Sequence, residues 1–346
     1  MATVFKTFLN NDAASTRTLL HESVPVTGSI ISGTYADANI KNYTHGLFQS
    51  VYDYPYLSSS ANHIFDITCG YSSASPLSAS AVSDGVSASD IKDKINMYNQ
   101  MAQILAGHDV DGNILQFDQD GNIAGGGKKL DAVYVLNFAR LLAKDEVKKG
   151  SFTLQLATGS TSSPVDFSEL LTVSDYGALN DYRVNSPAAE YGILYTSSAT
   201  PNSDSGVGLL YYQAGIAVLS ASLFDGAQLA GGLTYSASLS ASNIEANADA
   251  LRSRIYNVEF NNTTELNSSI YFCRVNNNEF NYSANPTYLS SSKMVVKEQT
   301  TDAPVSYITT VGLYSADNEL LAVAKLSEPL KKDPNNEMIL RVRLDY

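Results

Sequence analysis

The sequence predicts an α+β protein with a β-rich carboxyl-terminal half and a few amphipathic helices packed on antiparallel sheet. Segments after residue 150 alternate apolar and polar residues as strands do, and only a few segments show helical spacing. A hydrophobic content of 44% is ordinary for a globular protein and excludes disorder for the chain as a whole. At 346 residues, the chain is long enough for two or three modest domains or for one large one.

Composition changes along the chain and divides it into three regions. We expect an extended amino-terminal region, then a helical segment with an Asp-Gly hairpin, then a β-rich domain with one helix near residues 243–255; the regions are 1–75, 76–150 and 151–346. Val24-Pro25 and Tyr54-Pro55 disfavour a regular helix in the first region. The stretch 72–89 consists almost entirely of small residues and predicts a flexible connection.

Two helices are expected in the middle region. The first has a capping Ser89, a terminating Gly107 and apolar residues three or four positions apart, namely Ile91, Ile95, Tyr98, Met101, Ala102 and Leu105. The second spans roughly Leu130 to Lys148, with a broad apolar face and lysines at its carboxyl end, where the helix dipole favours cations. Gly150 is expected to end it.

The segment between these helices, DVDGNILQFDQDGNI, contains two Asp-Gly turns. They bracket Ile114–Phe117, so a small hairpin or meander is the simplest interpretation. The same stretch offers hard oxygen ligands at alternate positions, namely Asp109, Asp111, Asn113, Asp118, Asp120 and Asn122. A calcium-binding EF-hand loop needs its glycine one position later and a glutamate at position twelve, and neither copy has both. We therefore expect turns and no bound metal.

Strand patterns dominate the chain after Gly150. They are SFTLQLA, YGILY (191–195), GLLYYQAGIAVLSASLF (208–224), YITTVGLY (307–314), ELLAVAKL (319–326) and MILRVRLDY (338–346). One helix interrupts them, because Ser242-x-x-Glu245 forms a capping box before an apolar stripe that ends at Ile255. In the last strand, apolar residues alternate with polar ones, so one face is expected to be buried by Leu340, Val342, Leu344 and Tyr346.

Charge and hydropathy exclude several classes of partner. The net charge of −13 argues against nucleic acid and against an anionic membrane surface, because both need a basic footprint. The sequence contains no run of about eighteen apolar residues, which a membrane-spanning helix would need. Its start, MATVFKTFLNND, lacks the features of a secretory signal. We therefore expect the protein to stay in the cytoplasm unless another system exports it. Cys69 and Cys273 could in principle form a disulfide, but we expect two small buried hydrophobic residues and no zinc site.

Motifs that carry catalytic chemistry are missing from the sequence. The four histidines are not paired at the spacing that metal ligands have. The sequence also has no Gly-x-Ser-x-Gly motif that would place a serine nucleophile. The stretch GGGKK fails the phosphate-loop pattern, because Lys129 stands where Ser or Thr should bind magnesium. We therefore expect no catalytic, cofactor-binding or metal-binding residue. A glycosidase needs only two carboxylates, so an enzyme stays open as an alternative.

Two aromatic stretches are the candidate partner-binding residues. YFCRVNNNEFNYSANPTYL (271–289) and YDYPYL (52–57) contribute Tyr271, Phe272, Phe280, Tyr282, Tyr288, Tyr52, Tyr54 and Tyr56. Tyrosine buries a large rigid face at low entropic cost and still satisfies its hydroxyl. The asparagines and Pro286 of the longer stretch predict an irregular loop. That loop either docks on a partner or folds back over its own domain.

Several stretches together resemble a known group of proteins. They are HGLFQSVYDYPYLSSSANHIFDIT (45–68), KINMYNQMAQILAG (94–107), LNFARLLAKDEVKKGSFTLQL (136–156), LLYYQAGIAVLS (209–220), YFCRVNNNEFNYSANPTYL (271–289) and ITTVGLYSADNELLAVAKLSEPLKKDPNNEMILRVRLDY (308–346). They look like virion structural proteins of tailed phages, especially marine, contractile-tailed phages of the kind that infect cyanobacteria. The resemblance covers most of the chain and carries no catalytic signature and no binding residue.

This resemblance implies a virion structural protein. We expect a structural subunit of the phage tail, at the baseplate as a wedge-type protein or as another tail-attached connector. Its partners would be other virion structural proteins and copies of itself, with no nucleic acid and no membrane. It would be assembled into the virion in the cytoplasm of the bacterial host. A neck or tail-fibre-attachment protein is the first alternative. A receptor-binding module or a polysaccharide depolymerase is the alternative from another class, although no repeat typical of receptor-binding modules is visible.

Overall fold

The computed structural model describes most of the chain, namely residues 5–32, 35–80, 88–157, 167–196, 205–224, 239, 242–281, 289–290, 293–294, 301 and 304–346. The protein is β-rich, with antiparallel sheets and a few helices, at 46% strand and 15% helix. This composition agrees with the predicted α+β class dominated by β structure.

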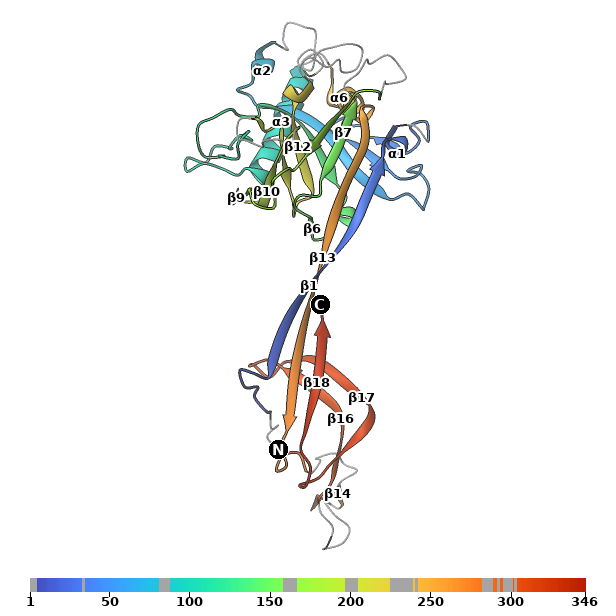
Figure 1. Cartoon of the computed structure of the whole chain (residues 1–346), viewed down its shortest axis with the longest axis vertical. Coiled ribbons are helices and arrows are strands. Elements are labelled where there is room, and N and C mark those ends of the chain that lie inside the picture. The colour runs from blue at the N-terminus through green and yellow to red at the C-terminus, as the bar shows by residue number, and fades with distance from the viewer. Residues whose placement is uncertain are drawn as a thin grey trace. The chain divides into compact units, whose positions relative to one another are not determined.

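The chain forms two compact units (Figure 1). Unit 1 comprises Met1–Leu19 and Glu265–Tyr346, and unit 2 comprises Leu20–Thr264. Strands β1 (Ala13–Thr27) and β13 (Ile255–Val275) contribute residues to both units. The regions predicted from composition run consecutively along the sequence, whereas unit 1 joins the two ends of the chain.

Unit 2 contains an eight-stranded sheet in which all neighbours are antiparallel. In spatial order its strands are β2 (Ile40–Asn42), β3 (Gln49–Tyr52), β4 (His63–Tyr71), β5 (Ala132–Phe138), β12 (Ile216–Ser220), β11 (Gly208–Tyr211), β10 (Ala189–Leu194) and β9 (Tyr182–Ser186). The predicted strands at 191–195 and 208–224 are confirmed within it, the latter as the hairpin of β11 and β12 followed by the 3-10 helix η3 (Ala221–Phe224).

A second sheet supplies the other layer of unit 2. It contains β1, β13, β7 (Thr153–Ala157) and β8 (Leu170–Ser174) in that order, and β6 (Glu146–Val147) also pairs with β13. The first hydrophobic core lies between the two sheets. There Phe138 of β5 packs against Phe152 and Phe260, with ring centroids 6.0 and 5.1 Å apart. The strand predicted in SFTLQLA is therefore β7.

The opposite face of the eight-stranded sheet carries the second hydrophobic core. Strand β5 shows the division, since Val133 and Val135 belong to this core while Tyr134 and Leu136 belong to the first. Helix α3 (Ala88–Leu105) covers this face with Tyr98, Ala102 and Leu105. Alternate residues of this central strand thus face different cores. Because both faces are covered, the strand appears in the sequence as a nearly continuous apolar run.

Helix α3 confirms the first predicted helix, and its approach to the sheet depends on a glycine. A Cβ at Gly70 of β4 would lie 2.4 Å from the carbonyl oxygen of Lys94 and 2.9 Å from the amide nitrogen of Tyr98. Only glycine allows the helix backbone this close to the strand. The remaining helices are α1 (Gly28–Ser32), α2 (Pro76–Ser80), α4 (Arg140–Ala143) and α6 (Ile244–Arg252).

Helix α6 confirms the predicted helix near 243–255, with two corrections. The capping residue is Asn243 and not Ser242, because the Asn243 side chain accepts from the Ala246 amide at 2.9 Å. Ile255 does not extend the helix stripe, since it is the first residue of β13. Ile244, Ala248 and Leu251 do face the first core as predicted.

The helix predicted over Leu130 to Lys148 is wrong. This segment forms strand β5, the single turn α4 and the two-residue strand β6. The sequence AVYVLNF of β5 is rich in β-branched and aromatic residues, which suit a pleated sheet. Burial on both faces gives this strand the same broad apolar character as a buried helix, so spacing alone could not separate the two.

The two Asp-Gly turns exist, but Ile114–Phe117 does not form the predicted hairpin strand. Only isolated bridges occur there, between His108 and Ile114 and between Asp118 and Lys129. Each turn is instead organised by an aspartate side chain that accepts amide hydrogen bonds from the residues two and four positions later. Such Asx turns replace a ladder of backbone bonds.

Unit 1 is built from strands of both chain ends. The hairpin of β16 (Ser306–Tyr314) and β17 (Leu320–Lys332) turns at Ser315–Asn318 as predicted, and the remaining strands are β14 (Leu289–Ser290), β15 (Lys293–Met294) and β18 (Met338–Asp345). Strand β18 pairs with β13 over eight residues, which confirms the predicted carboxyl-terminal strand. Val342 is buried, but Tyr346 is 72% exposed, so its predicted burial is wrong.

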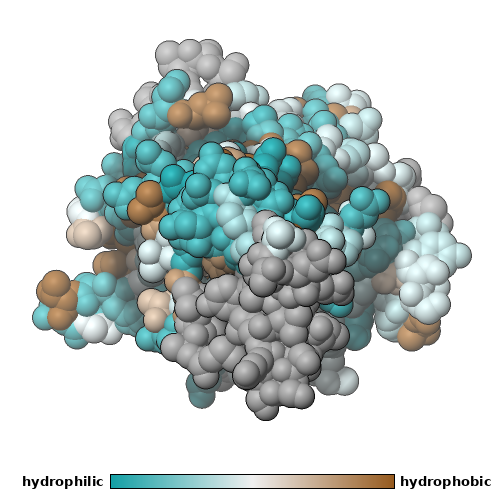
Figure 2. Space-filling model, turned by 90° about the horizontal axis from the view of Figure 1, so that it is seen from below, coloured by the Kyte–Doolittle hydropathy of each residue, from teal (hydrophilic) through white to brown (hydrophobic). Residues whose placement is uncertain are grey.

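One face of the molecule shows how polar and apolar residues are distributed over its surface. On the face shown in Figure 2, hydrophilic residues predominate outside the grey atoms, and the hydrophobic ones are scattered among them. None of the helices in the described ranges is long and apolar enough to cross a bilayer. Cys69 and Cys273 are free thiols, the first buried and the second half-buried.

Candidate partner-binding site

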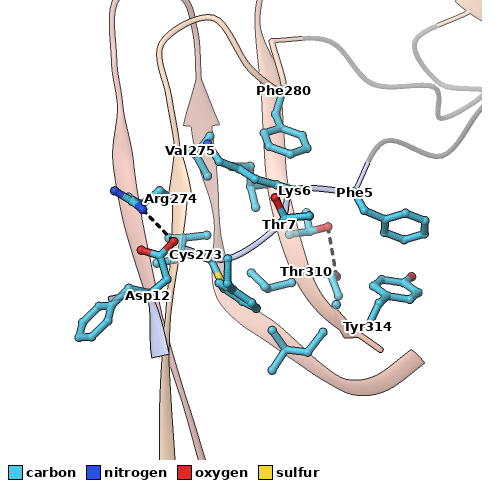
Figure 3. Close-up of a pocket in the computed structure, with 18 of the residues that line it drawn as sticks. Phe5, Lys6, Thr7, Asp12, Cys273, Arg274, Val275, Phe280, Thr310 and Tyr314 are labelled. Carbon is cyan, nitrogen blue, oxygen red and sulfur yellow. Dashed lines mark hydrogen bonds and ion pairs between the residues drawn. The ribbon is translucent and has the colours of Figure 1, made fainter. Parts of the chain in front are cut away.

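The candidate site is a groove of about 660 Å³ in unit 1, called here the aromatic groove. Its lining comes from the amino-terminal segment (residues 5–8 and Asp12), the end of β13 with the turn at Phe280, strand β16 with the turn that follows it, and strand β18 (Figure 3). Its lining is largely apolar and includes Phe272, Val275, Leu313 and Leu340. Grooves of this size and character bind ligands or protein side chains.

Asp12 fixes the amino-terminal segment over the end of β13. Its carboxylate accepts from the Arg274 guanidinium at 2.8 Å and from the Leu9 amide at 2.7 Å, and its carbonyl accepts from the Phe272 amide at 2.8 Å. Figure 3 shows the Asp12 and Arg274 side chains turned toward each other. The Leu9 amide and the Arg274 guanidinium hold the pKa of Asp12 below its ordinary value. One wall of the groove is therefore held by charge-assisted hydrogen bonds.

The turn after β13 forms a second wall, and Lys332 holds it. The fully buried Lys332 ammonium donates to the Asn277 carbonyl at 3.1 Å and to the Asn281 side chain at 2.7 Å. Within this turn Phe280 has a φ of 55°, a left-handed conformation that places its ring at the groove. Lys6 forms an ion pair with Glu279 and connects the turn to the amino-terminal segment.

Aromatic rings lie at the mouth of the groove and remain partly open to solvent. The rings of Phe5 and Tyr314 lie 4.7 Å apart, and the ring of Phe8 packs 5.4 Å from that of Tyr271. Phe5, Phe8, Phe280 and Tyr314 are 39%, 42%, 43% and 44% exposed. Each ring therefore keeps apolar surface for a further contact, and Phe5, Phe8 and Tyr314 are also held by a neighbouring ring.

The predicted site residues of the stretch 271–289 are only partly brought together. Phe272 and Phe280 line the groove, and Tyr271 contacts Phe8 beside it. The predicted irregular loop is wrong for Tyr271 and Phe272, which lie on β13, because pairing with β18 extends that strand to Val275. Tyr282, Tyr288 and Pro286 lie outside the described residues.

The second predicted stretch lies in unit 2, at the end of β3. Tyr52 and Tyr56 are half-buried, with ring centroids 6.2 Å apart, and Tyr52 also lies 5.5 Å from the ring of His63. Tyr54 is 45% exposed and packs edge-on against Tyr35 at 5.2 Å. These tyrosines form a surface cluster near the β2 edge, and they do not line the aromatic groove.

A short hydrogen-bond chain lies beside this cluster. The Asp66 carboxylate accepts from the Ser50 hydroxyl at 2.5 Å and contacts the His63 ring at 2.8 Å, and Ser50 lies 3.2 Å from the Tyr43 hydroxyl. A serine nucleophile needs the histidine as its direct base. Here the aspartate stands between the two, and Ser50 is 2% exposed, so the chain ties β3 to β4 and does not activate a nucleophile.

Sequence reasoning missed most residues of the groove, and three of the aromatic ones show why. Phe5 and Phe8 belong to the opening MATVFKTFLNND, and Tyr314 closes strand β16. Spacing gives no signal for them, because their partners are about 260 to 310 positions away along the chain. The available signal was local, namely two phenylalanines at i and i+3 in a segment that is too short to bury them itself.

The groove has apolar chemistry with neutralised charges. Lys6 with Glu279 and Asp12 with Arg274 pair off within it, and burial raises the pKa of the Cys273 thiol. Among the described residues, no three His, Cys, Asp or Glu side chains gather to hold a metal ion.

Comparisons with protein-family models, curated proteins and solved structures find no match for this chain.

Proposed function

We propose that this chain is a structural subunit of a phage virion, in the tail, where it serves as a wedge-type baseplate protein or another tail-attached connector. In this proposal the aromatic groove docks an apolar segment of a neighbouring virion protein. The β-rich carboxyl-terminal half supplies the docking surface, and the helices packed on antiparallel sheet in unit 2 support the fold. The protein is assembled in the host cytoplasm.

The observation that carries the docking role is the set of four half-exposed rings around one groove. Aromatic anchors that enter well-packed pockets contribute most of the energy of protein interfaces. The nearby charges are already paired, so a partner that covers them would not bury an unpaired charge, which is the costlier case. This pattern favours an apolar protein surface over a charged small molecule or a nucleic acid.

The groove is also held in place before any partner arrives. Asp12 fixes one wall and Lys332 fixes the turn that carries Phe280. Preorganised surfaces lose less conformational entropy on binding, which favours assembly with a defined geometry. A subunit that joins a particle of fixed symmetry needs such a surface.

The resemblance of the quoted segments to virion structural proteins of tailed phages supports a role in the particle. A neck or fibre-attachment position would use the same docking chemistry with different neighbours. No described feature favours a receptor-binding module or a depolymerase over these.

The test uses a phage that encodes this chain, with the native copy replaced by a tagged one. Wild-type tagged chain should be present in purified particles. The double variant Phe280→Ala with Tyr314→Ala should be incorporated several-fold less, as measured by quantitative blotting of particles. Its melting temperature as an isolated chain should stay close to that of the wild type, because both rings are more than two-fifths exposed.

Leu179→Ala is the matched control, since Leu179 is a 70% exposed apolar residue of unit 2 that does not line the groove. It should be incorporated like the wild type. Absence of the wild-type chain from particles would exclude a virion subunit. Normal incorporation of the groove variant would instead exclude only the docking role of the groove.

A further inference from the structure

The second Asp-Gly loop, Asp118–Lys129, encloses the ammonium group of its own last residue. The Lys129 ammonium donates to the Asp118 carboxylate at 2.6 Å and to the Gly125 carbonyl at 2.8 Å. It also contacts the carbonyl oxygens of Ile123 and Asn122 at 3.2 and 3.3 Å. Four oxygens therefore surround a group that has three N–H bonds. The set resembles the coordination shell of a cation more than an ordinary pair of hydrogen bonds.

The charges around the ammonium have the arrangement of a cation site. The Asp118 side chain is fully buried, and its other oxygen accepts from the Asp120 and Asn122 amides, both at 3.0 Å. Burial raises the pKa of Asp118, and the Lys129 ammonium opposes that rise. The side-chain hydrogen bond with Asp118 lowers the pKa of the Asp120 carboxyl group. Carboxylates combined with backbone carbonyls are the ligands that Ca²⁺ takes in proteins.

The loop that encloses the ammonium packs on the β9–β10 end of the sheet, so a change in the loop would affect its contacts with the sheet. The Tyr191 hydroxyl and the Asn185 side chain both donate to the Gly121 carbonyl at 2.9 Å, and the Gln119 side chain donates to Gly206 at 2.8 Å. These contacts need the loop carbonyls in fixed positions. An uncompensated carboxylate at Asp118 would disturb them.

We propose that Asp118–Lys129 is a cation-binding loop whose resident cation is the Lys129 ammonium, and that removal of this ammonium opens a site for Ca²⁺. The wild-type loop then needs no metal ion, because lysine supplies the positive charge at the centre of the oxygens. The inference does not rest on the proposed virion role.

The test compares Lys129→Ala with Lys128→Ala, its exposed neighbour. Without calcium, Lys129→Ala should melt several degrees below the wild type, while Lys128→Ala should not. Millimolar Ca²⁺ should raise the melting temperature of Lys129→Ala alone. Calorimetry with CaCl₂ should show one site on that variant, with a Kd on the order of 10⁻⁴–10⁻³ M, as in weak calcium sites. Adding Asp118→Asn should abolish that binding.

Two results would overturn the proposal. One is a folded Lys129→Ala chain that neither binds Ca²⁺ nor is stabilised by it. The other is calcium binding of equal strength to the wild type. If Lys129→Ala does not fold, Lys129→Gln decides, since it keeps a polar head without the charge. It should be destabilised, and a second change of Asp118→Asn should recover part of the loss. A Lys129→Gln chain that melts like the wild type would mean that the loop does not need the ammonium.

Discussion

Lysine side chains hold loops in place at three positions of this protein. Lys94 and Lys332 are fully buried and Lys129 is largely so, and each donates to backbone carbonyl oxygens. Lysine is rarely buried without such partners, because its charge must be compensated. Lys94 donates to the Leu239 and Ser242 carbonyls, and burial lowers its pKa although the charge of Asp90 opposes that shift. A charged side chain thus serves as a cross-link between segments.

Asp175 is the buried carboxylate whose titration should be measurable. It accepts from the Gly150 and Phe152 amides at 2.6 and 3.1 Å and from the Tyr212 hydroxyl at 3.1 Å. Burial raises its pKa to about 6 in spite of these bonds. A folded pKa above the unfolded value means that folding favours the protonated form.

The stability that Asp175 contributes should therefore be fully present below about pH 4 and lost as pH rises through about 6. The upper limit of this change is about 3 kcal/mol for a two-unit shift. Urea unfolding of the wild type and of Asp175→Asn from pH 4 to 8 checks it. The wild type should lose stability relative to the variant across this window. If the unfolding free energies of the two proteins changed with pH in parallel, Asp175 would not titrate within this pH window.

At the residue scale, sequence reasoning identified the aromatic character of the site but not its members. Phe280 and Phe272 were predicted, because an aromatic-rich stretch stands out in any window. Phe5 and Tyr314 were not, because their contact depends on a pairing of chain ends that no local pattern encodes. The Lys129 enclosure was also hidden, since GGGKK reads as a flexible turn until the oxygens around it are placed.

Among the elements, helix α3 was predictable and strand β5 was not, for one physical reason. Helix α3 has an exposed side, so its apolar residues leave a periodic stripe with charged residues between them. Strand β5 is covered on both faces and leaves no stripe. Hydrophobic periodicity arises where one face of an element is buried and the other is exposed. A central strand that is buried on both faces does not have this difference.

The contact between α3 and β4 gives the sharpest test at this scale. Gly70→Ala should lower the free energy of unfolding by at least the roughly 1–3 kcal/mol typical of overpacking, because its Cβ would meet helix backbone that cannot turn aside. Gly126→Ala is the matched control, since nothing lies within 4 Å of a Cβ there. Chemical denaturation measures both. Equal stability of the two variants would contradict the close helix–strand packing.

Strand β18 offers a second test within one element. Val342 is 8% exposed and Ile339 is 62% exposed, although both lie on the strand that pairs with β13. Val342→Asp should lose the roughly 1.5–3 kcal/mol of a buried aliphatic side chain and also bury a charge, whereas Ile339→Asp should change stability little. Thermal melting followed by circular dichroism distinguishes them. Similar losses in both would mean that the strand faces were assigned incorrectly.

For the molecule as a whole, net charge sets which partners can approach. The value of −13 and the low charged fraction of 16% argue against the basic surface that is needed to neutralise phosphates. We expect no binding of a fluorescently labelled 30-base-pair duplex at micromolar protein and about 0.15 M salt, measured by anisotropy. A salt-sensitive rise in anisotropy under these conditions would show a hidden basic site and would argue against a purely protein-binding role.

Unit 1 joins both ends of the chain, so its two parts are synthesised at different times. Its first part, Met1–Leu19, leaves the ribosome before the whole of Leu20–Thr264, and the strand that receives it follows only afterwards. At about 5–20 residues per second, this delay is on the order of 10–50 s. During that time Phe5 and Phe8 have no Tyr314 or Tyr271 to contact. Unit 2 can begin to fold during synthesis, whereas the aromatic groove forms only after the last strand has been translated.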